Sequence, residues 1–357
     1  MSASPSRGQR GAARDGPETL RFGVPTGRRI GPAALEFLDS CGLHVRQQSE
    51  RQLTATVNGL PGVIVTLQRT SDIVRLIADG IVDIGLAGRD FVQEYAPEGA
   101  DIVTLYPQLG FSSGDVVVAV PDTWVDVTTL ADLADVALSM RERGEQLRVG
   151  TAYPRLAQRF LHEKGITYFS IVLTEGSVEA TPWVGSADLI VELTVSGDSL
   201  RENRLKVLRN GVILHSECSL IGNRRALAAS ARKRELSRRI VELVEARLRA
   251  QGHYSVTANM RGGSEREVAL SLLASPATRG QRGPTVARVY TAAEDGDADA
   301  QWFAATVIVE ADALQEAIDH LRAAGGSGMS VVPVRYLFDA RSQHFAAALE
   351  QLSRSNA

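Results

Sequence analysis

Short apolar segments alternate with segments of helical periodicity in the first part of the chain. Leu20–Val24, Val63–Leu67 and Val82–Leu86 have the length and composition of buried strands, and apolar residues between Ser71 and Ile77 recur at helical spacing. Strands that alternate with helices usually pair in parallel, because each connecting helix crosses one face of the sheet. The pattern therefore predicts an α/β fold with a mostly parallel, buried sheet.

A second α/β unit is expected from residue 114, where a new series of elements begins. Asp115–Val120 is an expected strand that ends at Pro121, and Pro154–Lys164 is an expected helix that Gly165 stops. Five further segments are expected to form strand, strand, helix, strand and helix: Leu147–Gly150, Phe169–Leu173, Val178–Val184, Leu189–Leu193 and Asp198–Asn203. We expect the chain to return to the first unit near Val212–Ile221. Residues 20–113 and 216–250 would then form lobe I, and residues 114–215 lobe II.

The pattern changes in the last third of the chain. Ala226–Arg249 is expected to form one long helix with an apolar stripe, and with Arg and Lys on a solvated face. Beyond it the expected order is strand, helix, strand, strand, helix, strand: Tyr254–Ala258, Glu265–Leu273, Thr285–Tyr290, Phe303–Val309, Ala313–Leu321 and Met329–Val334. This βαββαβ order is that of a ferredoxin-like sandwich, which we assign to residues 251–340. Residues 1–19 are expected to be a disordered tail, and residues 341–357 a C-terminal helix or tail.

Composition narrows the function classes. Two cysteines, Cys41 and Cys218, are too few for a disulfide framework, and a net charge of −3 gives no reason to expect binding to nucleic acid or to a membrane surface. The longest apolar runs, such as Val116–Val120, are far shorter than the ~20 residues that span a bilayer. Met1–Pro17 lacks the apolar segment of a signal peptide. We expect a cytoplasmic protein.

The strongest candidate site is the turn that follows the expected strand Leu189–Leu193. Gly197 lies there between two hydroxyl residues, Ser196 and Ser199, and a helix follows. Backbone N–H groups at such a turn suit a phosphate monoester, and the glycine lets the backbone approach the ligand. Glu192, just before the turn, is placed to accept hydrogen bonds from sugar hydroxyls. The alternative is an ordinary helix start, capped by a side chain of the turn itself.

Other strand ends offer further groups for an anionic ligand. Glu179 follows a strand of lobe II, either near the ligand or in the first turn of a helix whose dipole it favours. Arg28, next to Arg29, and Arg89 follow strands of lobe I, where a guanidinium either binds phosphate or remains a surface charge. Tyr153 lies either against a base or in the core. Open α/β folds bind ligands at the carboxyl ends of their strands, so we expect these groups to converge.

Six motifs, in this order, resemble the ATP phosphoribosyltransferase family. Their order and spacing agree from about Leu20 to Asn223. They are Pro25-Thr26-Gly27-Arg28, Gly85-Leu86-Ala87-Gly88-Arg89-Asp90, Leu109-Gly110-Phe111, Thr151-Ala152-Tyr153-Pro154, Gly176-Ser177-Val178-Glu179 and Ser196-Gly197-Asp198-Ser199-Leu200. The later segments Pro284-Thr285-Val286, Ala323–Gly328 and Val331–Val334 resemble the regulatory domain of the family's long form.

The resemblance implies a fold and an activity. The fold is a two-lobed core similar to type II periplasmic binding proteins, followed by a ferredoxin-like (ACT-like) domain. The activity is the first step of histidine biosynthesis, in which adenine N1 of ATP displaces pyrophosphate from phosphoribosyl pyrophosphate. The resemblance also implies Mg²⁺ that arrives with the substrates, a homo-oligomer (dimer or hexamer) and feedback inhibition by histidine.

The resemblance also assigns roles to individual positions. The catalytic residues would be Arg28, Glu179 and Glu192. Contacts to the two substrates would come from Thr26, Gly27, Gly88, Arg89, Asp90, Tyr153, Ser196, Gly197, Asp198, Ser199 and Leu200. Thr285, Gly326 and Ser327 would lie near the histidine site, and no metal is expected to be held by protein ligands alone.

One departure keeps other functions open. The family usually has Lys where Thr26 stands, so one cation for the pyrophosphate is missing. A catalytically impaired regulatory paralogue, a cytosolic small-anion-binding protein of the same fold, and a phosphoribosyltransferase with another acceptor base are the alternatives.

Overall fold

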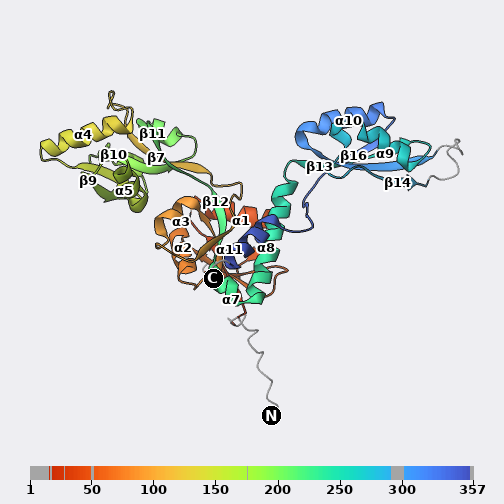
Figure 1. Cartoon of the computed structure of the whole chain (residues 1–357), viewed down its shortest axis with the longest axis horizontal. Coiled ribbons are helices and arrows are strands. Elements are labelled where there is room, and N and C mark those ends of the chain that lie inside the picture. Colours follow the sequence, from red (N-terminus) through yellow and green to blue (C-terminus); the bar gives the residue numbers. More distant parts are fainter. Residues whose placement is uncertain are drawn as a thin grey trace, which may run out of the picture. The chain divides into compact units, whose positions relative to one another are not determined.

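The computed structural model describes residues 16, 18–27, 29–49, 52–174, 176–290 and 301–353. The chain divides into two compact units, one made of Met1–Val244 with Arg341–Ala357 and the other of Glu245–Ala340. The first unit contains two α/β lobes, and the second is a small domain with one sheet (Figure 1).

Lobe I is built on a seven-stranded sheet in the order β2-β3-β4-β1-β5-β12-β6. Its strands are β1 (Leu20–Pro25), β2 (Val45–Arg46), β3 (Thr54–Val57), β4 (Val63–Gln68), β5 (Ile84–Gly88), β6 (Ile102–Tyr106) and β12 (Cys218–Asn223). β1 pairs in parallel with β4 and β5, whereas β12 runs antiparallel between β5 and β6. The expected strands at the start of the chain are confirmed, and their central residues are fully buried, as parallel strands covered on both faces require.

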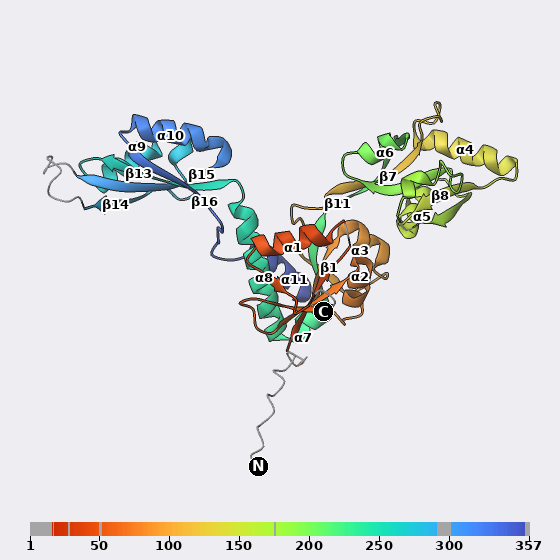
Figure 2. The same cartoon turned by 180° about the vertical axis from the view of Figure 1, so that it is seen from behind.

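Helices cover both faces of this sheet. α2 and α3 lie on one side, and α1, α8 and α11 on the other (Figures 1 and 2). The helices of lobe I are α1 (Gly31–Ser40), α2 (Thr70–Ala78), α3 (Arg89–Tyr95), α7 (Arg224–Ala229), α8 (Ala231–Ala250) and α11 (Gln343–Ser353). α2 packs closely because Gly85 has no side chain: a Cβ there would lie 2.6 Å from Cγ2 of Ile73.

Lobe II repeats the plan of lobe I. Its sheet has the order β11-β7-β10-β8-β9. The strands are β7 (Gly114–Pro121), β8 (Leu147–Thr151), β9 (Phe169–Leu173), β10 (Leu189–Thr194) and β11 (Leu205–Ser216), and the helices are α4 (Leu130–Glu142), α5 (Pro154–Glu163) and α6 (Asp198–Glu202).

The two lobes share one strand order and exchange the chain twice. The series β4-β1-β5-β12-β6 of lobe I corresponds to β9-β8-β10-β7-β11 of lobe II, and in each the fourth strand is antiparallel to its neighbours. That fourth strand is, in both lobes, the one that follows a crossing from the other lobe. The expected two-lobed core of the periplasmic-binding-protein type is confirmed.

Two expected helices are wrong in detail. The single helix predicted over Ala226–Arg249 is divided at Ser230, whose side chain accepts a hydrogen bond from the Lys233 amide and so begins α8 anew. The helix predicted over Val178–Val184 is only a 3-10 turn, Val178–Ala180. Pro182 has no amide hydrogen to give to the Val178 carbonyl, and the Thr181 hydroxyl donates to it instead, at 2.7 Å.

The second unit has the expected βαββαβ order. Its strands pair antiparallel in the order β14-β15-β13-β16, and two helices pack on one face. The elements are β13 (His253–Arg261), α9 (Glu265–Leu273), β14 (Thr285–Val289), β15 (Trp302–Glu310), α10 (Leu314–Ala323) and β16 (Ser327–Pro333). Alternate residues of β13 and β15 are buried against the helices, which confirms the ferredoxin-like class.

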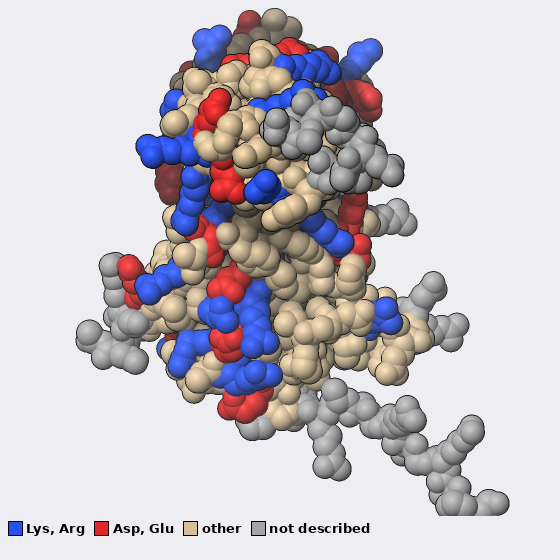
Figure 3. All heavy atoms as spheres, turned by 90° about the vertical axis from the view of Figure 1, so that its right-hand side faces the viewer, with Lys and Arg blue, Asp and Glu red and all other residues tan. Residues whose placement is uncertain are grey.

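Charges of both signs alternate on the molecule's surface. Arg238 of α8 pairs with Glu235 and Glu242, and Arg239 pairs with Glu235. The face drawn in Figure 3 likewise shows basic and acidic side chains side by side. Of the described helices, none combines the length and apolar character that crossing a bilayer demands.

Candidate functional site

The candidate residues of both lobes lie at or just after the carboxyl ends of strands. In lobe I these are the ends of β1 and β5, and in lobe II the ends of β8, β9 and β10. Contacts between residues of the two lobes occur where α3 follows β5 and α5 follows β8.

The turn after β10 is open to solvent and is not capped by its own side chains. Gly197 adopts a left-handed conformation with φ of 75°, and no side chain caps the helix α6 that follows. The expected alternative, a cap supplied by Ser199 or Asp198, is therefore not formed. Two amides are already engaged, since Gly197 N donates to Thr194 Oγ1 at 3.0 Å and Asp198 N donates to Ser196 Oγ at 3.4 Å. Ser196 and Ser199 are exposed, and their hydroxyls donate to carboxylates, Ser196 Oγ to Asp198 Oδ2 at 2.5 Å and Ser199 Oγ to Glu179 Oε1 at 2.6 Å.

The side chains next to the turn differ in their availability. Asp198 is exposed and pairs with Arg201. Its negative charge therefore offsets the positive charge that Arg201 brings to the turn. Leu200 is 2% exposed and packs in the core of lobe II. Its side chain is therefore not available to a ligand. Of the substrate contact expected at Leu200, only a hydrogen bond from the backbone amide remains possible.

Two carboxylates flank the turn. Glu179 accepts a hydrogen bond of 2.6 Å from Ser199 Oγ, and Glu192 accepts one of 2.9 Å from the Leu193 amide. Burial is the largest of the effects that together raise the pKa of Glu192 to about 7. The hydrogen bond from the Leu193 amide lowers this pKa, and the nearby negative charge of Glu179 raises it. Glu192 is therefore an acid whose charge changes near neutral pH.

A buried carboxylate of lobe I holds side chains of both lobes. Asp90 is 0% exposed and accepts hydrogen bonds from Tyr153 OH at 2.8 Å, from Arg29 Nη2 at 2.9 Å and from Ser216 Oγ at 2.7 Å. Ser216 Oγ also accepts from the Asp90 amide. Asp90 and Tyr153 were expected to face the substrates. The structure instead places both inside the contact between the lobes, where the Tyr153 ring is 4% exposed and lies against no open space for a base.

The arginine that the structure brings into the site is Arg29. Its guanidinium is 40% exposed, lies over the Phe91 ring and shares an electrostatic interaction with Glu192 of the other lobe. The sequence reasoning chose the neighbouring Arg28, which lies outside the described residues. No periodicity separates the two positions, because both follow the same strand and precede the same helix.

The remaining predicted residues of lobe I differ in exposure. Thr26, Gly27 and Arg89 are exposed, as ligand contacts require. Gly88 is buried for a packing reason: a Cβ there would lie 2.2 Å from Asp90 Oδ1, so the glycine makes room for the buried carboxylate.

The residues expected near a histidine site do not meet within one copy of the small domain. Thr285 is on β14, whereas Gly326 and Ser327 are at the start of β16, and β15 and β13 lie between these two strands. Three strand spacings amount to ~14 Å. Sequence reasoning missed a row of hydroxyls on the sheet face away from the helices, made by the cross-strand partners Thr285, Thr306, Thr257 and Ser330.

A hydroxyl, an imidazole and a carboxylate also line up where the chain crosses between lobes. Ser113 Oγ lies 3.3 Å from His215 Nε2, and Nδ1 of that ring lies 2.8 Å from Asp115 Oδ1. The segment Gly110–Gly114 has the spacing GxSxG, but its motif serine is Ser112 rather than Ser113, and the strand β7 follows it rather than a helix. The Asp115 side chain is 44% exposed, unlike the buried acid of a hydrolytic triad. These contacts hold β7 and β11 together.

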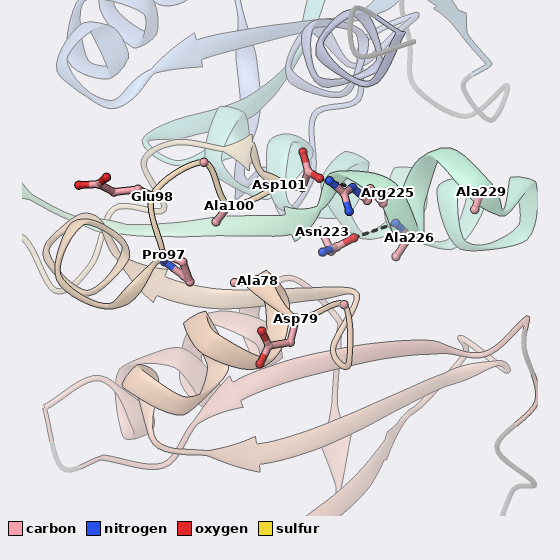
Figure 4. A pocket seen from close by; sticks show the side chains of 12 residues that line it. Ala78, Asp79, Pro97, Glu98, Ala100, Asp101, Asn223, Arg225, Ala226 and Ala229 are labelled. Carbon is pink, nitrogen blue, oxygen red and sulfur yellow. Dashed lines mark hydrogen bonds and ion pairs between the residues drawn. The ribbon is translucent and has the colours of Figure 1, made fainter.

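A cavity of about 520 Å³ lies at the opposite edge of the lobe I sheet from Gly88. It is lined by the end of α2, the loop before β6 and the start of α7, as Figure 4 shows. Asn223 bonds to the Ile77 carbonyl and the Ala226 amide, and Asp101 pairs with Arg225. The side chains of Asn223, Asp101 and Arg225 thus bond to other protein groups. The cavity also lies at the other end of the strands from the candidate residues, so we do not include it in the site.

Comparison with known proteins identifies the family. Residues 69–246 match the family model of ATP phosphoribosyltransferase, and residues 250–336 match that of its C-terminal domain. ATP phosphoribosyltransferase 1, chloroplastic, of Arabidopsis thaliana is 35% identical over 94% of this chain and 81% of its own length. The ATP phosphoribosyltransferase of Chelativorans sp. is 41% identical over 64% of this chain and 98% of its own length.

Among solved structures, a chain of the ATP phosphoribosyl transferase (HisG:HisZ) complex from Thermotoga maritima aligns with 64% of this chain and 96% of its own. Its TM-score is 0.49 and its sequence identity 23%. The two matched family models and the relatives at 35–41% identity establish that the chain belongs to the ATP phosphoribosyltransferase family, the pentosyltransferases of the first step of histidine biosynthesis.

Proposed function

We propose that this chain joins adenine N1 of ATP to C1 of the ribose of phosphoribosyl pyrophosphate. The new C–N bond forms as the bond between C1 and the pyrophosphate oxygen breaks, and the pyrophosphate leaves with that electron pair. No protein nucleophile is needed, so the protein aligns two anionic substrates and balances charge. The observation that carries the proposal is the uncapped Gly197 turn beside Glu179 and Glu192, electrostatically coupled to Arg29 of lobe I.

The lobe II turn is proposed to hold the 5′-phosphate of the donor. Ser196 and Ser199 would turn their hydroxyls from Asp198 and Glu179 to the phosphate, and Gly197 adds no side chain of its own beside the Arg201 guanidinium, whose Nη1 lies 3.3 Å from the Cβ position of Gly197. Glu179 and Glu192 lie where the ribose hydroxyls of such a donor would be. Thr26, Gly27 and Arg89 are exposed on lobe I and are proposed to contact the pyrophosphate and ATP.

Mg²⁺ is proposed to enter with the substrates and to neutralise the polyphosphate charge. Within the described ranges, no group of three or more His, Cys, Asp or Glu side chains is arranged to hold an ion. Glu179 and Glu192 offer hard oxygen ligands beside the turn. This donor set fits an ion that keeps most of its waters and is held largely by phosphate oxygens.

The proposed transfer has a direct assay. Purified full-length protein with Mg²⁺, ATP and phosphoribosyl pyrophosphate should form phosphoribosyl-ATP, seen by its absorbance, and an equal amount of pyrophosphate. Pyrophosphate without phosphoribosyl-ATP, or product only with another base, would indicate a different acceptor. Binding of both substrates without turnover would indicate an anion-binding or regulatory paralogue.

The charge of Glu192 predicts a pH dependence. If its carboxylate stabilises the positive charge that develops on the ribose, kcat/KM should rise as pH increases through about 7, since this quantity reports ionisations of the free enzyme. Glu192→Gln should lose this rise and fall in kcat on the order of a hundredfold. The ratio of wild-type to variant kcat/KM, measured from pH 5.5 to about 8.5, cancels titration of the substrates. A ratio that does not change with pH would contradict this role.

Thr26 tests the impaired-paralogue alternative. Thr26→Lys would add an exposed cation at the proposed pyrophosphate position. If wild type turns over, the variant should change kcat/KM by less than about tenfold, because Arg29 already supplies a cation there. A gain of several hundredfold in steady-state turnover would show instead that the natural chain is impaired.

Regulation and assembly are proposed from the small domain. The exposed positions Thr285 and Ser327, on separate strands, suit a histidine site completed by a second copy of the chain, in a dimer or hexamer. Assays with and without histidine, together with the mass of the protein in solution, test this. A cytoplasmic location is part of the same proposal.

A further inference from the structure

Helix α3 of lobe I carries two buried carboxylates one helical turn apart. Asp90 is 0% and Glu94 2% exposed, and both face residues of lobe II. Side chains four positions apart lie on the same face of a helix. Burying two carboxylates costs free energy unless each is hydrogen-bonded or paired with a cation. The groups that bond to Glu94 therefore indicate what its burial achieves.

The partners of Glu94 are the first amides of helix α5 in lobe II. Oε1 accepts from the Arg155 amide at 3.0 Å, and Oε2 accepts from the Leu156 amide at 2.9 Å. α5 has no cap of its own: the residue before it is Tyr153, which makes no capping hydrogen bond, and Pro154 has no amide hydrogen. The free amides of a helix start attract negative charge. A carboxylate of the other lobe therefore caps α5.

The contact is reciprocal. Nη1 of Arg155 donates to the backbone carbonyls of Glu94 at 3.0 Å and of Ala96 at 2.8 Å, which lie at the end of α3. These carbonyls belong to the last turn, where a helix lacks internal donors. Each helix thus satisfies the end of the other, across the two lobes.

This contact is adjacent to the proposed active site along both helices. Glu94 lies one turn after Asp90, and the capped amides come directly after Tyr153, the tyrosine that bonds to Asp90. Asp90 in turn holds Arg29, the cation that interacts electrostatically with Glu192. A shift of α5 relative to α3 would therefore move Tyr153 away from Asp90 and change the position of Arg29.

We propose that Glu94 and Arg155 form a latch that holds the lobes in the arrangement required for substrate binding. Glu94 is a positioning residue in this proposal, which rests on the proposed function for its kinetic consequences but not for the lobe arrangement itself. Without the latch, open arrangements become populated, and apparent substrate affinity falls in proportion to the closed fraction.

The test measures the lobe distance directly. Spin labels on cysteines introduced at Leu53 of lobe I and Leu138 of lobe II, which are 60% and 54% exposed, report that distance, while the native Cys41 and Cys218 are buried. Glu94→Gln keeps the side-chain shape but has one acceptor oxygen for two amides. Glu36→Gln is the matched control, since Glu36 is an exposed carboxylate on α1 of lobe I and takes part in none of the contacts between the lobes described here.

The expected result is a broader distance distribution for unliganded Glu94→Gln, which narrows again when ATP and phosphoribosyl pyrophosphate are added. KM for both substrates should rise about tenfold, with kcat changed less than about threefold. Glu36→Gln should match wild type.

A distribution for Glu94→Gln that matches wild type, or a loss of kcat at unchanged KM, would overturn the latch. If Glu94→Gln does not fold, Arg155→Met removes the other half of the contact and decides by the same criteria. An inactive wild type with a broadened Glu94→Gln distribution would refute the proposed function and leave the latch supported.

Discussion

Gly197→Val should weaken binding of phosphoribosyl pyrophosphate by at least about a hundredfold. Valine is strained at the φ of 75° that Gly197 adopts, so the turn must rearrange, and its β-branched side chain would occupy the space proposed for the phosphate. Loss of two hydrogen bonds to a charged group is worth roughly 3–6 kcal/mol, which corresponds to more than two orders of magnitude in affinity. Calorimetric titration of the donor into the variant measures the effect.

The matched control is Gly185→Val. Gly185 is also in lobe II and has φ of 73°, but it precedes β10, at the other end of that strand from the turn. It should suffer the same backbone strain and a similar fall in the unfolding midpoint, with donor affinity close to wild type. Equal affinities in Gly197→Val and wild type would remove the turn from the donor site.

Arg29→Met should reduce kcat/KM by a factor on the order of several hundred and also destabilise the fold. The variant loses the cation that interacts electrostatically with Glu192 and leaves Asp90 buried with a negative charge and no positive partner. Removal of one partner from a buried pair costs roughly 3–5 kcal/mol. About 2 kcal/mol is expected here, because the Arg29 side chain is 40% exposed. Denaturant unfolding and steady-state kinetics measure the two effects separately.

A double variant separates catalysis from stability. Arg29→Met with Asp90→Asn removes the unpaired charge while Asn keeps the shape and can still accept from Tyr153. Its stability should recover most of the loss, whereas its kcat/KM should stay at the level of Arg29→Met. Recovery of activity together with stability would mean that Arg29 acts only through the fold.

The sequence was informative where its signal was local. Apolar runs marked β1, β4 and β5 of lobe I and β7 to β10 of lobe II, and the β-α-β-β-α-β order marked the small domain. The strands β2, β3, β6 and β11 were not predicted. Glycine followed by hydroxyl residues after β10 marked the turn, because such a turn is defined by a few neighbouring residues. The failures were also local in cause: the break at Ser230 follows a side-chain hydrogen bond, and the turn at Val178–Ala180 ends early because Pro182 has no amide hydrogen.

The contacts between the lobes could not be predicted from the sequence. Whether Asp90 faces a ligand or a tyrosine 63 positions away depends on how two separately folded lobes meet. The choice between Arg28 and Arg29 depends on the same arrangement. One clue was available: Asp90 and Glu94 place two carboxylates on one face of a short helix, where apolar residues are expected if that face is buried.

The most direct test of the central claim is a crystal structure of the full chain with phosphoribosyl pyrophosphate and Mg²⁺. The 5′-phosphate should lie at the turn of Ser196, Gly197 and Ser199, with the ribose beside Glu179 and Glu192 and the pyrophosphate toward Arg29. A donor bound with its 5′-phosphate on lobe I, or with no contact to this turn, would contradict the account.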